Sequence, residues 1–556
     1  MTRFVLLSPA ARAARSAPLM VGAALAALVV LAPLVSLALH ALGADVAHWA
    51  HLVDYVLPQA LANTAWLLLG VGLVVTLLGT GTAWLVTAYD FPGRSWLTWA
   101  LLLPMAVPTY IVAFAYLDLL HPIGPIQTAL RAVLGYDGPR DFRLPDLRSL
   151  PGAIFVLGFV LYPYVYLSTR VMFTSQAASL LEAARTLGAG RFEVFRRVVL
   201  PMARPAIAVG LSLALLETLN DIGASEFLGV QTLTVAVYTT WVTRSDLGGA
   251  AQIALTMMAL AVGLILLERH GRRRQRFANT QRMRPMSPRL LRGGRAWLAL
   301  GLGLLPVVIG FAAPTAYLVA ESWKRLHRVR GVSEHLLAGL VNTLTVSLAA
   351  TVVTVLGGLL LAWAARRYVE SERPGPARWF SRIGSLGYAV PGTVLAIGML
   401  APLLAVDRLL HAWIDSVGLI VMGSTTALVC AYFIRFLAIP VGAVEAGLTR
   451  IPASLEQASR LLGETAGGTL RRVHLPLLRP AIAAAALLVF VDTMKELPAT
   501  LLLRPLNFDT LSTWLYAEAA RGTYEEGAVA ALAIVLAGLL PVILLARTNL
   551  RMGSQG

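Results

Sequence analysis

Apolar runs of about 20 residues recur from one end of the chain to the other, and they restrict the possible folds more than any other feature. A helix needs about 20 such residues to cross a bilayer, whereas a membrane-spanning strand needs only about 9–11. Because a backbone in lipid must satisfy its own hydrogen bonds, runs of this length indicate helices. Charged residues make up only 13% of the sequence, against about 25% in soluble proteins. We therefore predict an all-α polytopic membrane protein.

The apolar runs predict about twelve transmembrane helices. The first run is longer than the roughly 7–15 apolar residues of a cleaved signal peptide, so we expect it to be retained. The helices are expected at about residues 18–42, 60–87, 96–120, 152–175, 205–228, 248–268, 297–320, 338–365, 383–405, 418–445, 479–503 and 526–547.

One polar segment occurs twice in this apolar chain. Residues 182–207 read EAARTLGAGRFEVFRRVVLPMARPAI, and residues 457–482 read QASRLLGETAGGTLRRVHLPLLRPAI. Aligned without gaps, 13 of the 26 positions are identical. A long match at a fixed spacing indicates an internal duplication. We therefore predict two tandem six-helix domains, 1–268 and 296–556, joined by a linker, 269–295.

Two shorter matches support the duplication. Asn63-Thr64 near the start of the second helix corresponds to Asn342-Thr343 in the eighth, at a spacing of 279. Val107-Pro108 in the third helix corresponds to Val390-Pro391 in the ninth, at a spacing of 283. The spacing of the long polar repeat is 275, so a few residues of insertion separate these matches.

The distribution of arginine predicts the orientation in the membrane. The linker 269–295 contains ten Arg, and basic connections stay in the cytoplasm. Both polar repeats then also lie on the cytoplasmic side, as do the N- and C-termini, whereas a polar segment at 121–150 lies on the far side. Domains in the same orientation are related by an axis along the membrane normal. The formal charge of +17 does not indicate a nucleic-acid partner, because the chain has no basic domain with interleaved aromatics.

The repeated polar element has two interpretations. A solvated cytoplasmic loop would need no function, but it would not explain why half of the residues recur in register. A docking element for a cytosolic partner explains the recurrence, with Gly188 and Gly463 providing sharp turns. Pro201 and Pro476 are expected to end the second helical run of each element.

The element resembles the EAA motif of ABC-importer permeases. Glu182, Ala183, Ala184 and Gly188 match its first part, followed by VVLP at 198–201. In the second copy Gln457, Ala458, Ser459 and Gly463 match it with Gln in place of Glu, followed by VHLP at 473–476. The resemblance implies that each element, 182–201 and 457–476, contacts one cytosolic ATPase subunit, and that the second contact is weaker or differently bonded.

ATP hydrolysis is not expected in this chain itself. Its two lysines, Lys324 and Lys495, do not stand in a phosphate-binding G-x-x-x-x-G-K-[ST] motif. We expect a transport subunit that binds no cofactor, with ATP and Mg used by two separate ATPase subunits. A periplasmic binding protein is expected to be a further partner.

Charged residues in the helix after each polar element are candidates for a translocation pathway or gate. ETLND at 217–221 aligns with DTMKE at 492–496, and the outer residues of each set are four apart, which predicts one shared helix face. Carboxylates suit a hard cation such as Fe(III). Alternatively, they lie at the membrane interface or brace the two domains, and Glu226 nearer the surface is expected to be solvated. The candidates are Glu217, Asn220, Asp221, Asp492, Lys495 and Glu496; no metal ligands are specified.

A wider resemblance concerns the substrate. The stretches LPMAVPTYIVAFAYLDLL, LYPYVYLSTR and MKELPATLLLRPLNFDTLSTWLY are similar to fused ferric-iron permeases that work with periplasmic binding proteins. This resemblance implies iron import across a bacterial inner membrane. Related permeases carry thiamine, sulfate, molybdate or polyamines, so another substrate remains an alternative. An ion-coupled secondary transporter would not need the EAA element, and the nine His have no metalloenzyme spacing.

Overall fold

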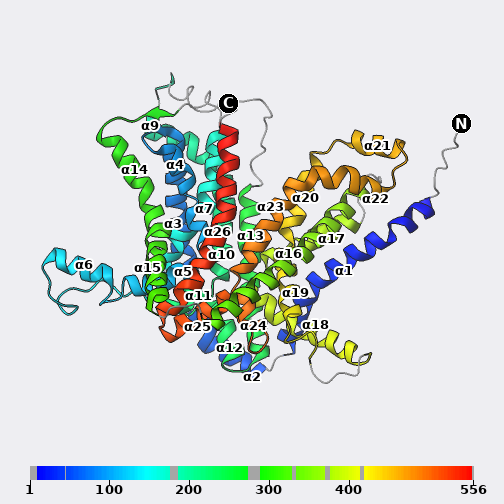
Figure 1. The fold of residues 1–556 in the computed structure, drawn as a ribbon, viewed down its shortest axis with the longest axis horizontal. Helices are drawn as coiled ribbons and strands as arrows, with labels where there is room; N and C mark the ends of the chain where they lie inside the picture. The colour runs from blue at the N-terminus through cyan, green and yellow to red at the C-terminus, as the bar shows by residue number, and fades with distance from the viewer. Residues whose placement is uncertain are drawn as a thin grey trace. The chain divides into compact units, whose positions relative to one another are not determined.

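The computed structural model describes residues 9–43, 46–175, 186–188, 190–272, 288–328, 333–369, 376–413 and 419–553, and these are almost entirely helical (Figure 1). The chain divides into two compact units. One comprises Ala44–Gly339 and Thr510–Gly556 and is called the α3 unit; the other comprises Met1–Gly43 and Leu340–Asp509 and is called the α23 unit. Each unit is described by itself.

The predicted number of transmembrane helices is confirmed. Ten helices of the described chain are long and apolar enough to cross a membrane, and two bent helix pairs raise the number to twelve. Each predicted span overlaps one of these twelve. The sharper bend, 91°, separates 94–106 from 109–119 at Val107-Pro108. Val107 is extended there, as expected of a residue that precedes proline.

The α3 unit is built around α3 (Leu57–Ala88), α7 (Leu150–Ser175) and α10 (Leu200–Asn220), which pack on one another. Its other elements are α2 (Val46–His51), η1 (Leu52–Val56), β1 (Tyr89–Asp90), α4 (Arg94–Ala100), η2 (Leu103–Ala106), α5 (Thr109–Leu119), α6 (Pro125–Leu134), α9 (Arg191–Val194), η3 (Phe195–Val199), α11 (Gly223–Phe227), α12 (Leu233–Val242), α13 (Leu247–Arg272), β2 (Arg289–Leu290), α14 (Gly294–Val307), η4 (Val308–Ala312), α15 (Ala313–Arg328), α25 (Leu511–Arg521) and α26 (Tyr524–Gly553).

The α23 unit repeats much of this arrangement with helices from the second half of the sequence. Its α20 packs on α23, and α18 packs on α19 and α24. Its elements are α1 (Pro9–Leu42), α16 (Glu334–Val369, from Leu340 onward), α17 (Pro376–Gly384), η5 (Leu386–Ala389), α18 (Gly392–His411), α19 (Thr425–Phe436), α20 (Ala438–Thr449), α21 (Ala453–Leu461), α22 (Ala466–Thr469), η6 (Leu470–His474), α23 (Leu475–Met494) and α24 (Pro498–Leu503).

A matching glycine allows close helix packing in each unit. A Cβ on Gly79 would lie 2.8 Å from the backbone N of Tyr166, and a Cβ on Gly358 would lie 3.0 Å from that of Val441. The two glycines are 279 apart, and the two facing residues are 275 apart. Helices in lipid associate through such small residues because packing, rather than hydrophobicity, drives their contact.

The first helix of each sequence half packs in the unit formed mainly by the other half. Helix α1 packs on α17 and α18, and helices α14 and α15 pack on α4 and α5. The compact units therefore divide the chain differently from the predicted domains 1–268 and 296–556, which stay a prediction about the sequence repeat.

The structure describes the predicted linker 269–295 only at its two ends. Residues 269–272 complete α13, and β2 pairs in parallel with β1, so that Tyr89 lies opposite Arg289. The middle of the linker, 273–287, lies outside the described residues.

Candidate functional site

The first polar element is described only in part. Glu182, Ala183 and Ala184 lie outside the described residues. Gly188 has a φ of 85°, which confirms the sharp turn expected there, and the side chain of Leu187 is 88% exposed. The chain continues through α9 and η3 into α10.

The second polar element is described in full. Gly463, also at a φ of 85°, turns the chain from α21 towards α22. Of the predicted contact residues, Gln457 and Ala458 are exposed on α21. Ser459 is buried, and its Oγ lies 3.0 Å from Oγ1 of Thr469. Ser459 therefore joins the two short helices, so within this chain it acts as a brace.

Each element ends in a π-helical turn before its Leu-Pro. The backbone N–H of Leu200 donates to the carbonyl of Phe195, and that of Leu475 donates to the carbonyl of Leu470. The prediction that Pro201 and Pro476 end the helical run is wrong. Both lie in the first turn of α10 and α23, which continue directly from η3 and η6. Proline is tolerated in the first turn of a helix. In each element the π-helical turn, η3 or η6, precedes the proline.

A buried carboxylate that the sequence analysis missed anchors the second element. Oε1 of Glu456 accepts hydrogen bonds from Nε of Arg366 at 3.1 Å and lies 3.1 Å from Nε2 of His474. The element is thereby tied to α16 and to η6. Glu456 immediately precedes Gln457, so the second copy does carry a glutamate, but one position early and facing inward. A glutamate one position before the motif was the sequence signal that could have identified this residue.

We predict that Glu456→Ala destabilises the second element. Hydrogen bonds to charged groups contribute about 1.5–3 kcal/mol each to stability. We expect the loss in this variant to be near the lower value, because Arg366 is partly exposed. Helix α21 should then be cleaved faster by a protease in the purified complex. The matched control is Glu464→Ala, since Glu464 pairs with the exposed Arg472. Equal cleavage rates in both variants would contradict the anchoring role.

Asp221 lies between α10 and α11 in the α3 unit. Its Oδ1 accepts hydrogen bonds from the backbone N–H groups of Ala224, at 2.8 Å, and Ser225, at 3.1 Å. Its Oδ2 accepts one from the hydroxyl of Thr109, the first residue after Val107-Pro108. Asp221 thus caps α11 and joins it to the start of α5.

Glu496 has the corresponding position in the α23 unit, between α23 and α24. Its carboxylate accepts hydrogen bonds from the backbone N–H groups of Ala499, at 2.9 Å, and Thr500, at 3.0 Å. Nη1 of Arg435 lies 3.4 Å from its Oε1. Gly392 corresponds to Thr109, and a Cβ there would lie 2.9 Å from the same oxygen. An arginine thus takes the place of the threonine hydroxyl.

The prediction that the paired carboxylates share one helix face is wrong. Helix α10 ends at Asn220, and α23 ends at Met494. Asp221 is extended, and Lys495 is the C-cap residue before Glu496. The reason is that the second carboxylate of each pair bonds to the N–H groups of the next short helix. A spacing of four therefore does not describe one continuous helix here.

The other candidate residues are less buried. Glu217 and Asn220 are half-buried on α10. Asp492 forms an ion pair with Lys495 at 2.8 Å, one turn along α23. The two sets belong to different compact units. Among the described residues, no three His, Cys, Asp or Glu side chains are grouped so as to hold a metal ion.

Glu226 is not simply solvated as expected. It is half-buried on α11, and its Oε2 accepts a hydrogen bond from the hydroxyl of Tyr516 on α25. Burial raises the pKa of this carboxyl group. The ring of Tyr516 stacks on Phe227 with 5.5 Å between centroids. The contact joins the end of the α10–α11 segment to α25 within the α3 unit.

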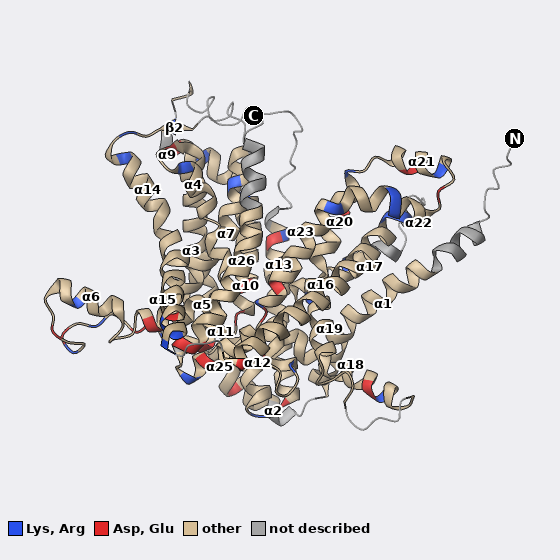
Figure 2. Cartoon of the chain, viewed as in Figure 1, with Lys and Arg blue, Asp and Glu red and all other residues tan. Residues whose placement is uncertain are grey.

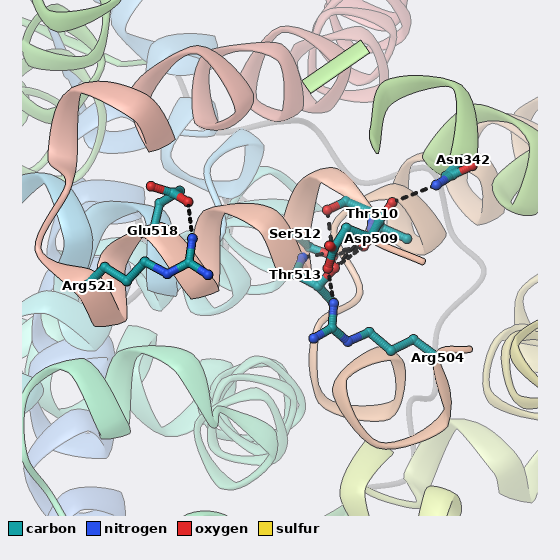
Figure 3. Close-up of polar contacts among 8 residues, drawn as sticks. All are labelled: Asn342, Arg504, Asp509, Thr510, Ser512, Thr513, Glu518 and Arg521. Atoms are coloured by element: carbon teal, nitrogen blue, oxygen red, sulfur yellow. Dashed lines mark hydrogen bonds and ion pairs between the residues drawn. The ribbon is translucent and has the colours of Figure 1, made fainter. Parts of the chain in front are cut away.

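The two Asn-Thr matches have the same structural role. Nδ2 of Asn63 donates to the carbonyl of Gln231 at 3.1 Å, and Nδ2 of Asn342 donates to the carbonyl of Asp509 at 3.0 Å (Figure 3). The next residue is in each case a threonine whose hydroxyl caps a helix, Thr232 for α12 and Thr510 for α25. These asparagines therefore hold the chain just before the two helix starts.

The comparisons with known proteins agree with the repeat. Residues 76–277 and residues 355–551 each match the family model of the binding-protein-dependent transport system inner membrane component. The chain is 27% identical over 493 residues to the Fe(3+)-transport system permease protein FbpB 2 of Haemophilus influenzae, covering 88% of this chain and 89% of that protein.

Two further relatives show the range of the similarity. The probable ABC transporter permease protein y4fN of Sinorhizobium fredii is 25% identical over 510 residues, which cover 88% of this chain and 87% of that protein. The molybdenum transport system permease protein ModB of Escherichia coli is 32% identical over 191 residues. That match covers 33% of this chain and 80% of ModB, so ModB corresponds to one of the two repeats in length.

Proposed function

The chain belongs to the family of binding-protein-dependent transport system inner membrane components, and from this premise we propose that it imports ferric iron, driven by separate ATPase subunits. Two ATPase subunits would dock on residues 182–201 and 457–476. The observation that supports docking is the structure of the second element. Helix α21 presents Gln457 and Ala458 on a support formed by Ser459 and Glu456, and Leu462 beside Gly463 is 85% exposed.

The exposed leucines suit a partner cleft. Leu187 and Leu462 are identical in the two copies, and both precede the glycine at a φ of 85°. At such a turn the leucine side chain protrudes from the surface and can enter an apolar cleft of a partner. Replacing Gly188 by Trp would block this turn, and assembly or coupling should be lost.

The charge distribution of the α3 unit supports a cytoplasmic position for the first polar element. In the α3 unit, Asp and Glu gather around α11, α25 and the adjacent end of α15, whereas Lys and Arg are prominent at the end that carries α9 (Figure 2). Basic ends face the cytoplasm. Helix α26 ends at the α9 end of this unit (Figure 1), so the C-terminus would be cytoplasmic as well.

The half-buried charges favour a cation as the cargo. Glu217 and Asp492 present carboxylates on α10 and α23, and the nearby Lys495 is neutralised by Asp492. The charges of Glu217, Asp492 and Lys495 sum to −1, so an oxyanion such as molybdate would meet net negative charge at these residues. Fe(III) prefers oxygen ligands. The relative from Haemophilus influenzae is named for Fe(3+) transport. We assign Glu217, Asn220, Asp492 and Lys495 to the pathway, with Asp221 and Glu496 holding the adjacent breaks as parts of a gate.

The substrate assignment is tested by ATP hydrolysis of the complex reconstituted in vesicles. Iron-loaded binding protein should stimulate hydrolysis and deliver iron to the side of the ATPase. The same protein without iron is the control, and thiamine-loaded and molybdate-loaded binding proteins are the alternatives. Stimulation by the thiamine-loaded protein alone would show that the chain belongs to an importer for another cation.

A further inference from the structure

Helix α6 has its polar residues turned inward and its apolar residues turned outward. Gln127 is 2% exposed and Arg131 is 5% exposed, whereas Val133 and Leu134 are 84% and 51% exposed. A surface helix in water has the opposite arrangement. The sequence analysis described 121–150 as a polar segment on the far side of the membrane and did not predict this helix.

The polar face of α6 contacts the chain on both sides of the helix. Nε2 of Gln127 donates to the carbonyl of Leu120 at 2.6 Å, and its Oε1 accepts from the backbone N–H of Leu144 at 3.1 Å. Nη2 of Arg131 donates to the hydroxyl of Thr128 at 3.2 Å. The hydrogen bonds of Gln127 to Leu120 and Leu144 hold the helix in one rotation, and they fix the outward direction of its apolar face.

The apolar face forms one stripe. Ile126, Leu130, Val133 and Leu134 are spaced by four, three and one, which places them on one side of the helix. Leu130 is half-buried and the other three are exposed. The helix ends at Gly135, which has a φ of 78°. The loop beyond it alternates acidic and basic residues, among them Arg143 and Asp146 at 3.7 Å. An apolar stripe bordered by mixed charges suits the boundary between acyl chains and headgroups.

The position of α6 points to lipid as the occupant. The helix lies between α5 and α7, directly after the end of a membrane-spanning segment. It runs across the direction of α14 and α15 at the end of the α3 unit that carries α11 and α25 (Figure 1). Leu73 and Leu77 on α3 and Leu302 on α14 are likewise exposed apolar residues of this unit, so its outer surface already requires a bilayer.

We propose that α6 is an interfacial helix whose stripe of Ile126, Leu130, Val133 and Leu134 inserts into the outer leaflet of the membrane. A helix of this kind, lying in the plane of the interface, gains from each apolar side chain that enters the acyl region. It would hold the ends of α5 and α7 at a defined depth. This inference does not depend on the transported substrate.

A spin label at position 133 tests the proposal. In a Cys430→Ser background, Val133→Cys is labelled, and the whole complex is reconstituted in vesicles of phosphatidylethanolamine and phosphatidylglycerol. Oxygen concentrates in lipid and a nickel chelate stays in water, so their collision rates with the label report its depth. The controls are Leu77→Cys on a spanning helix and Asp137→Cys in the polar loop. All three complexes should keep the ATPase activity of the parent.

The ratio of oxygen to nickel collisions at position 133 should be several-fold higher than at position 137 and lower than at position 77, because an interfacial helix lies less deep than the middle of a spanning helix. A ratio equal to that at position 137 would show that α6 faces water. Protection from both reagents, or a label that becomes immobile only when the binding protein is added, would show that a protein covers the helix. Either of these results would overturn the proposal.

Discussion

Replacing Glu496 by alanine is expected to abolish transport and to destabilise the α23 unit by about 3–5 kcal/mol, the cost of removing one partner of a buried ion pair. The change leaves the guanidinium of Arg435 without its carboxylate. It also removes the acceptors of the Ala499 and Thr500 N–H groups. The side chain of Glu496 is only 1% exposed, so water does not replace these bonds. Thermal unfolding of the purified complex and uptake in vesicles measure the two effects.

The matched control for this experiment is Asp492→Ala on the same helix. Asp492 and Lys495 are both partly exposed, and such pairs contribute about 0–1 kcal/mol. A loss of stability in Asp492→Ala as large as that in Glu496→Ala would contradict the capping role of Glu496.

The variant Asp221→Asn tests whether Asp221 acts through its hydrogen bonds to α11 or through its charge. Asn keeps a side-chain oxygen that can accept from the N–H groups of Ala224 and Ser225. Asp221→Asn should therefore keep much of the transport if Asp221 holds α11, while Asp221→Ala should lose it. Equal loss in both variants would instead mean that the charge itself is needed, as a cation pathway through Asp221 requires.

The second large effect is expected at Gly463. A β-branched residue is a genuine outlier at a φ of 85°, so Gly463→Val should displace α21 from its support. Left-handed backbone costs about 1–2 kcal/mol in a residue with a side chain. This cost corresponds to roughly a tenfold loss in the affinity of docking. ATP-driven uptake should fall by about that factor while the α23 unit remains folded.

Gly467→Val is the matched control in the same element. Gly467 has no positive φ, and a Cβ there meets open space. Uptake and the affinity of the ATPase subunit for the permease should remain near those of the parent in this variant. If the two variants behave alike, the turn at Gly463 has no special role in coupling.

The features that depend on apolar runs and sequence repeats were predictable. Lipid imposes a helix on each long apolar run, so all twelve predicted spans overlap observed ones. The repeat placed Gly188 and Gly463 in equivalent turns, and both have a φ of 85°. The match between Val107-Pro108 and Val390-Pro391 indicated a shared feature, although its form, a broken helix followed by a contact to Asp221 or Glu496, was not evident.

What depends on tertiary contacts was not predictable. Asp221 was predicted to share a helix face with Glu217 because the two are four residues apart. Its carboxylate instead accepts a hydrogen bond from the next helix. Glu456 was missed because it lies one position before the residues that match the motif. The packing of α1 with α17 and α18 leaves no periodic signal, because a lipid-facing helix and a protein-facing helix are both apolar. The orientation of α6 depends on hydrogen bonds to Leu120 before it and Leu144 after it.

The central claim is that this chain moves its substrate only when separate ATPase subunits act on its two polar elements. The most direct measurement is uptake of ferric iron into vesicles that contain the permease with or without the ATPase subunits, with iron-loaded binding protein outside. We predict uptake only with the ATPase subunits and ATP, and loss of uptake when both Gly188 and Gly463 are replaced by Val. Uptake driven by an ion gradient in vesicles without the ATPase would contradict the account and indicate a secondary transporter.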